Sequence, residues 1–127
     1  MTKSFSALLA LTLGTMIATS GDAAIAADQI GETQMCIDSQ KIHNTPIIDR
    51  KTILVEMRAP RGFKRIDLVS ECSGLRDGVG FGYSTSINKL CKQDTLKVLE
   101  TAGGTCLIDQ IVTIDEQEAR ALLARKR

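Results

Sequence analysis

The chain has 127 residues, with 16 lysines and arginines against 15 aspartates and glutamates, and its net charge is +1. A near-neutral total excludes a global electrostatic attraction to nucleic acid or to anionic lipid, so no nucleic-acid partner is expected. Aromatic residues make up 3% of the chain and there is no tryptophan, so the core must be built from isoleucine, leucine and valine. A domain of this size then gains much from cross-links.

The N-terminal residues have the pattern of a cleavable secretory signal. Lys3 precedes an apolar run from Phe5 to Ala18, and Ala24-Ile25-Ala26 supplies small residues for cleavage. A membrane anchor is the alternative, but a spanning helix needs about 20 apolar residues and polar residues interrupt this run. We therefore expect residues 1–26 to be a signal peptide and residues 27–127 to be a single periplasmic or secreted domain, with no transmembrane segment after cleavage.

All four cysteines, Cys36, Cys72, Cys91 and Cys106, lie in the mature part, where an oxidising compartment would pair them. The chain-entropy formula gives a sum of roughly 7 to 8 kcal/mol for each of the three connectivities, so entropy does not choose among them. We prefer Cys36–Cys106 with Cys72–Cys91 on a guess of strand order alone. Because no Cys-x-x-Cys occurs, neither a zinc knuckle nor a dithiol redox pair is indicated, and no metal or cofactor is expected.

From residue 36 onward the apolar periodicity is mostly two, which predicts short strands separated by turns. The first expected strand runs from Cys36 to His43, and the strongest runs from Thr52 to Met57. Turns are expected at 44–46 and 58–62, because proline and glycine occur there. The remaining strands are expected at 63–69, 79–85, 89–91, 95–99 and 106–112, with a tight hairpin loop at 101–105.

The periodicity changes near the C-terminus. Thr113-Ile114-Asp115-Glu116 resembles a capping box, and Ala119, Leu122 and Leu123 share one face of a helix expected at about 115–126. The predicted fold class is therefore mainly β: a small antiparallel sheet or partly closed barrel with one C-terminal helix, stabilised by disulfides.

Three glycines form the first candidate binding surface. Strand alternation over 79–85 would place Gly78, Gly80 and Gly82 on one bare face, which admits close approach of a ligand. Packing of a neighbouring strand, or a bend at a barrel corner, is the commoner reason for such glycines.

The second candidate surface is the basic stretch Arg58, Arg61, Lys64 and Arg65. These side chains could meet lipid headgroups, lipopolysaccharide phosphates or an acidic partner. A solvated flank of the turn at 58–62 is the plainer interpretation. The basic tail at 124–127 has the same two interpretations, because cations also stabilise the end of a helix.

A catalytic interpretation would rest on His43, the only histidine, together with Asp49 or Asp94. Such a hydrolase needs two of these groups to meet in one pocket, and no nucleophile motif such as Gly-x-Ser-x-Gly accompanies them. The sequence therefore identifies no catalytic residue.

Several short words between the cysteines resemble a family of small secreted four-cysteine proteins of Gram-negative bacteria, known only as a domain of unknown function. They are Cys36-Ile37, the stretches 49–54, 68–75 and 90–98, the aromatic pair Phe81 and Tyr83, and Cys106. The resemblance covers about 36–112 and implies an envelope location and paired cysteines, but no activity, substrate or binding residue.

Together these features predict a binding or structural accessory module of the cell envelope, which would recognise an envelope protein or ligand through a sheet face or edge. A small envelope hydrolase is the alternative, followed by a metal or redox protein that uses the cysteines. Oligomeric state is not predicted.

Overall fold

The structure is a computed structural model that describes residues 29–85 and 87–126; the expected signal peptide, residues 1–26, lies outside the described residues. It confirms the predicted fold class, a mainly antiparallel sheet curled into a half-barrel with one C-terminal helix and two disulfides. The elements in chain order are β1 Thr33–Gln34, β2 Cys36–Asp38, the 3-10 helix η1 Ser39–Lys41, β3 Ile42–Asn44, β4 Ile47–Asp49, β5 Thr52–Arg58, β6 Arg61–Leu68, β7 Phe81–Tyr83, β8 Lys89–Cys91, β9 Thr95–Val98, β10 Thr105–Ile114 and α1 Glu116–Arg125.

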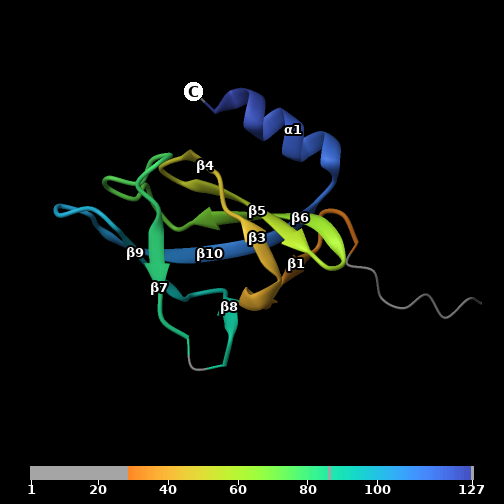
Figure 1. The fold of residues 1–127 in the computed structure, drawn as a ribbon, viewed down its shortest axis with the longest axis horizontal. Coiled ribbons are helices and arrows are strands. Elements are labelled where there is room, and N and C mark those ends of the chain that lie inside the picture. Colours follow the sequence, from red (N-terminus) through yellow and green to blue (C-terminus); the bar gives the residue numbers. More distant parts are fainter. Residues whose placement is uncertain (1–28, 86, 127) are drawn as a thin grey trace, which may run out of the picture.

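Three long strands, β5, β6 and β10, form the centre of the main sheet, whose order is β3-β5-β6-β10-β9-β7. β1 also pairs with β10, and β4 also pairs with β5, while β2 and β8 form a separate two-stranded ribbon. The chain from β1 through β2 to β3 thus runs from the β10 edge to the β5 edge. Figure 1 shows α1 on one side of the curled sheet and β8 on the opposite side.

We call the face of the sheet toward the β2–β8 ribbon the inner face and the face toward α1 the outer face. Strand alternation in β5 sends Ile53 and Val55 to the inner core and Leu54 to the outer core. The inner core is the larger, because residues from β2, β8 and β9 and from the loops also enter it. Its buried members are Ile37, Ile47, Ile53, Val55, Ile66, Leu68, Cys72, Leu75, Leu90, Leu96, Val98, Ile108 and Ile111.

A β-bulge in β10 changes which residues face inward. The pairing with β6 shifts between Ile108 and Gln110, so that Ile108 and Ile111 both belong to the inner core. After the bulge, Val112 belongs to the outer core. A bulge inserts one extra residue into a strand, so the residues of this ten-residue strand that face the inner core are even-numbered before the bulge and odd-numbered after it.

The predicted helix is confirmed, but the capping box expected at residues 113–116 does not form. Asp115 is the N-cap, and its Oδ1 accepts a hydrogen bond from the backbone N–H of Glu118 at 2.7 Å. Thr113 is still in the sheet, where its N–H donates to the Glu32 carbonyl at 2.9 Å. Ala119 and Leu122 are the helix residues buried against the outer face.

Two predicted strands are shorter than expected. The segment 36–43 is interrupted by η1, because the Asp38 side chain accepts a hydrogen bond from the Gln40 N–H at 3.0 Å and turns the chain. In the segment 79–85, only Phe81–Tyr83 forms strand β7. The expected strand at Lys89–Cys91 is confirmed as β8.

The disulfides join Cys36 to Cys91 and Cys72 to Cys106, so the preferred pairing was wrong. Cys36 and Cys91 lie directly opposite each other in the β2–β8 ribbon. Cys72 is buried in the loop after β6, and Cys106 packs beside it on β10. The error arose because the β2–β8 pairing joins segments that are far apart in sequence, and local patterns do not indicate such a pairing.

Candidate functional site

Two adjoining pockets lie around the hairpin that connects β5 to β6. The first has a volume of about 390 Å³ and the second about 610 Å³. We call the two together the hairpin groove, because both are lined by Ile30, Met57, Arg61, Gly62, Phe63 and Ile114. Volumes of about 300–1,000 Å³ are usual for small-molecule sites.

The walls of the groove come from several elements that the sheet topology brings together. Met57 is opposite Gly62 across the hairpin, and the turn between the two strands contains a cis Ala59–Pro60 peptide bond. Ile114 stands where β10 ends, opposite Phe63. Ile37 of β2 closes the first pocket from the inner side. Apolar side chains therefore make up most of the lining of the first pocket.

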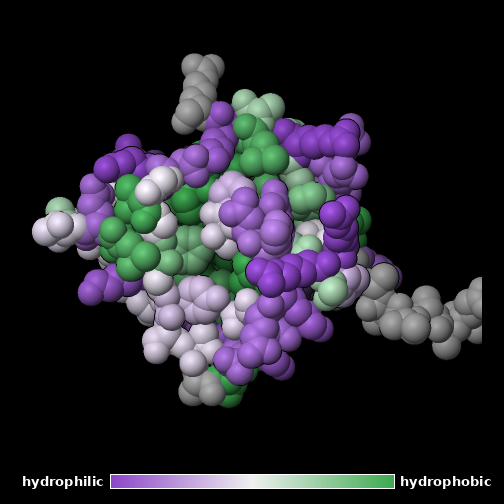
Figure 2. Space-filling view, in the orientation of Figure 1, coloured by the Kyte–Doolittle hydropathy of each residue, from purple (hydrophilic) through white to green (hydrophobic). Residues whose placement is uncertain are grey.

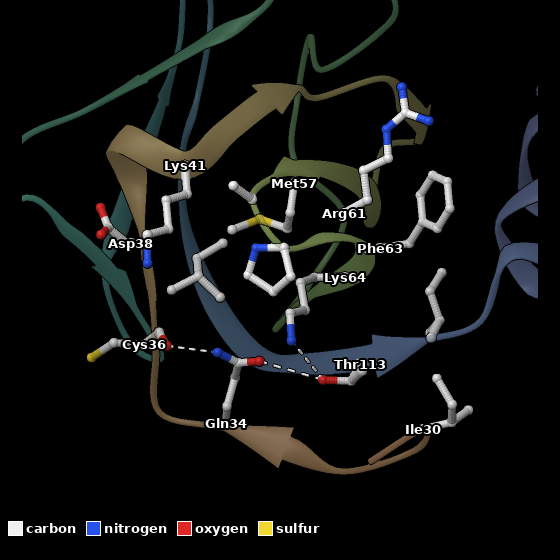
Figure 3. A pocket seen from close by; sticks show the side chains of 15 residues that line it. Ile30, Gln34, Cys36, Asp38, Lys41, Met57, Arg61, Phe63, Lys64 and Thr113 are labelled. Atoms are coloured by element: carbon white, nitrogen blue, oxygen red, sulfur yellow. Dashed lines mark hydrogen bonds between the residues drawn. The ribbon is translucent and has the colours of Figure 1, made fainter. Parts of the chain in front are cut away.

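Lys64 lies at the base of the first pocket, where it is only 6% exposed. Its Nζ donates to Thr113 Oγ1 at 2.8 Å, the Thr113 hydroxyl donates to Gln34 Oε1 at 3.4 Å, and Gln34 Nε2 donates to the Cys36 carbonyl at 2.7 Å. Figure 3 shows these side chains pointing toward one another from β6, β10 and β1. The network links the neighbouring strands β6, β10 and β1 across the base of the pocket.

The charges at the rim of the groove differ in whether they are already paired. Asp115 caps α1, and Glu116 forms an ion pair with Arg120 at 2.7 Å. Within residues 29–85 and 87–126, no hydrogen bond or ion pair engages the side chains of Lys41, Arg61 or Glu56. These three side chains are therefore available to a bound molecule.

The structure divides the basic stretch that the sequence suggested as one surface. Arg58 and Arg61 are exposed at the hairpin, Lys64 is buried on the inner face, and Arg65 lies on the outer face beneath α1. The stretch is thus neither one patch nor a wholly solvated flank. The reason is strand alternation, which sends the neighbours Lys64 and Arg65 to opposite faces of the sheet.

Arg65 is held in a network of ion pairs on the outer face. Its Nε lies 2.9 Å from Asp67 Oδ1 and its Nη1 lies 2.5 Å from Glu118 Oε1, while Gln110 Nε2 also donates to Asp67 at 2.7 Å. Burial lowers the pKa of Arg65, but its hydrogen bonds and attraction to Asp67 and Glu118 outweigh burial and raise it. Arg65 therefore joins β6 to the helix and is not presented to a ligand.

The three glycines do not form one bare strand face. Gly78 and Gly80 are in turn conformations with φ of +85° and +78°, and only Gly82 lies in a strand. The side chain of Leu99 covers Gly80 and Gly82. A Cβ added at Gly82 would lie 3.4 Å from Leu99 Cδ2. Here the glycines serve turn geometry and close packing. Figure 2 shows hydrophobic side chains gathered over this end of the sheet, near β7 and β9.

His43, Asp49 and Asp94 line three different pockets. Asp49 accepts hydrogen bonds from the Lys51 N–H at 2.8 Å and from Arg125 at 3.0 Å, and Asp94 accepts one from the Cys91 N–H at 2.7 Å. The described pockets do not bring two of the three together. Arg125 and Lys126 of the basic tail form ion pairs with Asp49 and Asp77, which fix the end of α1.

Among the described residues no group of three histidine, cysteine, aspartate or glutamate side chains is arranged to hold a metal ion, and no helix is long and apolar enough to cross a membrane. The four cysteines are all in disulfides. None of them is available as a thiolate ligand in this form of the protein.

Sequence reasoning missed Gln34, Thr113 and Lys41 as parts of the site, and placed Lys64 in a surface stretch. One signal was present for Lys64: it is in phase with Ile66 and Leu68, so alternation places it on the buried face of β6. Nothing local indicated Gln34 or Thr113, because their meeting depends on the pairing of β1 with β10.

Comparisons with protein-family models, with curated proteins and with solved structures each gave no match. The candidate site is therefore interpreted from its geometry and chemistry alone.

Proposed function

We propose that this chain is a binding module of the bacterial cell envelope, periplasmic or secreted, and that the hairpin groove is its binding site. The observation that carries the proposal is the make-up of the groove, in which apolar side chains form most of the walls and a few charged ones stand unpaired at the rim. Binding sites for small molecules combine a mostly apolar cavity with a few convergent polar groups in this way.

The envelope location is supported by two independent features. The first is the expected signal peptide at residues 1–26, and the second is the pair of disulfides, which persist in oxidising compartments. Membership of the secreted four-cysteine family of Gram-negative bacteria is part of the same proposal and rests on the ordered cysteines and the short words between them.

The groove is a better candidate than the free strand edges. The sheet ends at β3 and β7, and each of these strands has three residues, so an added strand would gain few backbone hydrogen bonds. A small hydrolase is less well supported, because His43, Asp49 and Asp94 line separate pockets.

Native mass spectrometry of the protein purified from the periplasm tests the proposal, because a bound molecule adds mass that denaturation removes. The decisive variant is Gly62→Leu. Gly62 lines both pockets, and a Cβ there meets no atom within 4 Å, so a leucine fills the groove without a clash near the backbone.

Thr105→Leu is the control, because it adds a similar apolar side chain at an exposed position on β10 that lines neither pocket. An adduct that the wild type and Thr105→Leu carry and Gly62→Leu lacks would support the proposal. No adduct at all, or one that Gly62→Leu retains, would contradict it.

A further inference from the structure

The charges that line the first pocket are mainly positive. Lys41, Arg61 and Lys64 contribute to its walls, against a single carboxylate, Asp38. That carboxylate already accepts a hydrogen bond from the Gln40 N–H at 3.0 Å. The pocket therefore has an electrostatic preference for an anion.

Two of the cations are accessible to a ligand. Lys41 ends η1, Arg61 begins β6, and both are exposed and unpaired in the part of the chain that the structure describes. Figure 3 shows them in different parts of the pocket wall, with Met57 between them. Lys64 is a positioning residue here, since its Nζ is committed to Thr113.

The second pocket is the more acidic of the two, because Glu56, Asp115 and Glu116 line it against Arg61, so the preference for an anion belongs to the first pocket. Asp115 and Glu116 are engaged by the cap of α1 and by Arg120. Glu56 is the remaining unpaired carboxylate, and it lines only the second pocket. An anionic group in the first pocket thus avoids the one free acid, while an uncharged tail lies against Phe63 and Ile114.

From this arrangement we infer that the hairpin groove binds an amphipathic anion, a molecule with one alkyl or acyl chain and a carboxylate or phosphate head. The inference rests on the proposed function and specifies the ligand of that site. The head contacts Arg61, which is exposed and lines both pockets, through charge-assisted hydrogen bonds, which are stronger than neutral ones, and Lys41 on the other side of Met57 adds a longer-range attraction. The chain packs on the apolar lining shared by the two pockets, where it loses contact with water.

Four probes of matched structure test the inference by titration calorimetry below their micellar concentrations. Dodecanoate and dodecyl phosphate carry an anionic head, dodecyltrimethylammonium carries a cationic head on the same chain, and acetate has the head without the chain. We expect both anionic amphiphiles to bind at least tenfold more tightly than the cationic one, and acetate not to bind measurably. Equal binding of all three amphiphiles, or binding of acetate alone, would overturn the inference.

The two anionic probes also separate the sources of the ligand. Tighter binding of dodecanoate indicates a free fatty acid, and tighter binding of dodecyl phosphate indicates a lipid with a phosphate headgroup. Either result agrees with the shared chemistry.

Arg61→Gln and Arg58→Gln form a matched pair for locating the head. The two arginines are opposite each other across the hairpin and both are exposed, but only Arg61 lines the groove. Arg61→Gln should weaken dodecanoate binding roughly tenfold, while Arg58→Gln should leave it within about twofold. Equal losses in both variants would show that general positive charge, and not a contact in the groove, attracts the probe.

The outcome distinguishes this inference from the proposed function. If a native adduct is lost in Gly62→Leu but the probes do not discriminate between head groups, the groove is a binding site and the ligand class is wrong. If no adduct exists and no probe binds, both fail.

Discussion

The two faces of the sheet are built in different ways. The inner face buries residues from most of the strands and from the loop that carries Cys72, and both disulfides attach segments to that side. The outer face is covered by one helix, of which only Ala119 and Leu122 are buried, and Arg65, Asp67 and Glu118 form ion pairs beside them. The inner face therefore buries more apolar side chains than the outer face, while the groove takes residues from both: Lys64 from the inner face, and Phe63 and Ile114 from the outer one.

The largest expected effect is at the centre of the inner core. Ile66→Ala should lower the free energy of unfolding by roughly 3–5 kcal/mol, because Ile66 is fully buried and the truncation leaves a cavity. Leu122→Ala on the outer face, where the side chain is 7% exposed and solvent can fill the space, should cost about 2–3 kcal/mol. Urea unfolding of the two variants measures the difference. Equal losses would remove the distinction between the faces.

Removing the disulfide of the ribbon tests whether the segment opposite the helix needs a cross-link. Cys91→Ser should lower stability by roughly 2–5 kcal/mol, since it releases a constraint on a chain segment of 55 residues and leaves an unpaired thiol. Neither strand of the ribbon pairs with the main sheet, so apart from this disulfide the ribbon is held by the continuing chain and by the packing of Ile37 and Leu90 in the inner core. Thermal unfolding under non-reducing conditions gives the measurement. An unchanged midpoint would show that the ribbon is held by packing alone.

The polar network at the base of the groove is the next test. Thr113→Val keeps the shape of the side chain but removes the acceptor for Lys64 Nζ, and should cost roughly 1–3 kcal/mol because a buried donor loses a partner. Thr113→Ser retains the hydroxyl and serves as the control. If the valine variant is as stable as the serine variant, the hydrogen bond does not stabilise the base of the pocket.

The smallest effect is expected from the ion pairs of the outer face. Arg65→Met should cost about 1 kcal/mol, because the pairs are partly solvated and the methionine retains most of the apolar contact. The folded protein raises the pKa of Arg65, so this contribution is fully present below the pKa of the unfolded chain and is lost only as pH rises through the higher, folded one. The difference between wild type and variant should therefore not decline between pH 7 and pH 9. Chemical unfolding at both pH values checks this, and a decline there would assign the effect to another group.

The periodicity of apolar side chains predicted much of the fold. β5, β8 and the helix have periodicities that leave little choice, and the structure places them within a residue or two of the expected ends. Misassigned regions were those where one side chain redirects the backbone. At η1 an aspartate turns the chain, and in 78–80 glycines with positive φ replace an expected strand.

The candidate site was less predictable than the fold. Arg61 was identified as a candidate from its charge, and the structure places it in the groove. The glycine surface and the basic stretch were not brought together as one site. Lys41, Gln34 and Thr113 come from three separate segments. Thr113 meets Lys64 because β10 pairs with β6, and Gln34 joins them because β1 pairs with β10.

By itself, then, the sequence determined the class of the domain, the identity of its longest strands and its helix, because these depend on side-chain periodicity over a few residues. Only the tertiary structure decided the disulfide pairing, the division of the basic stretch between two faces and the existence of the groove. Each of these depends on which distant strands pair and in which register, and a one-residue bulge in β10 is enough to change the result.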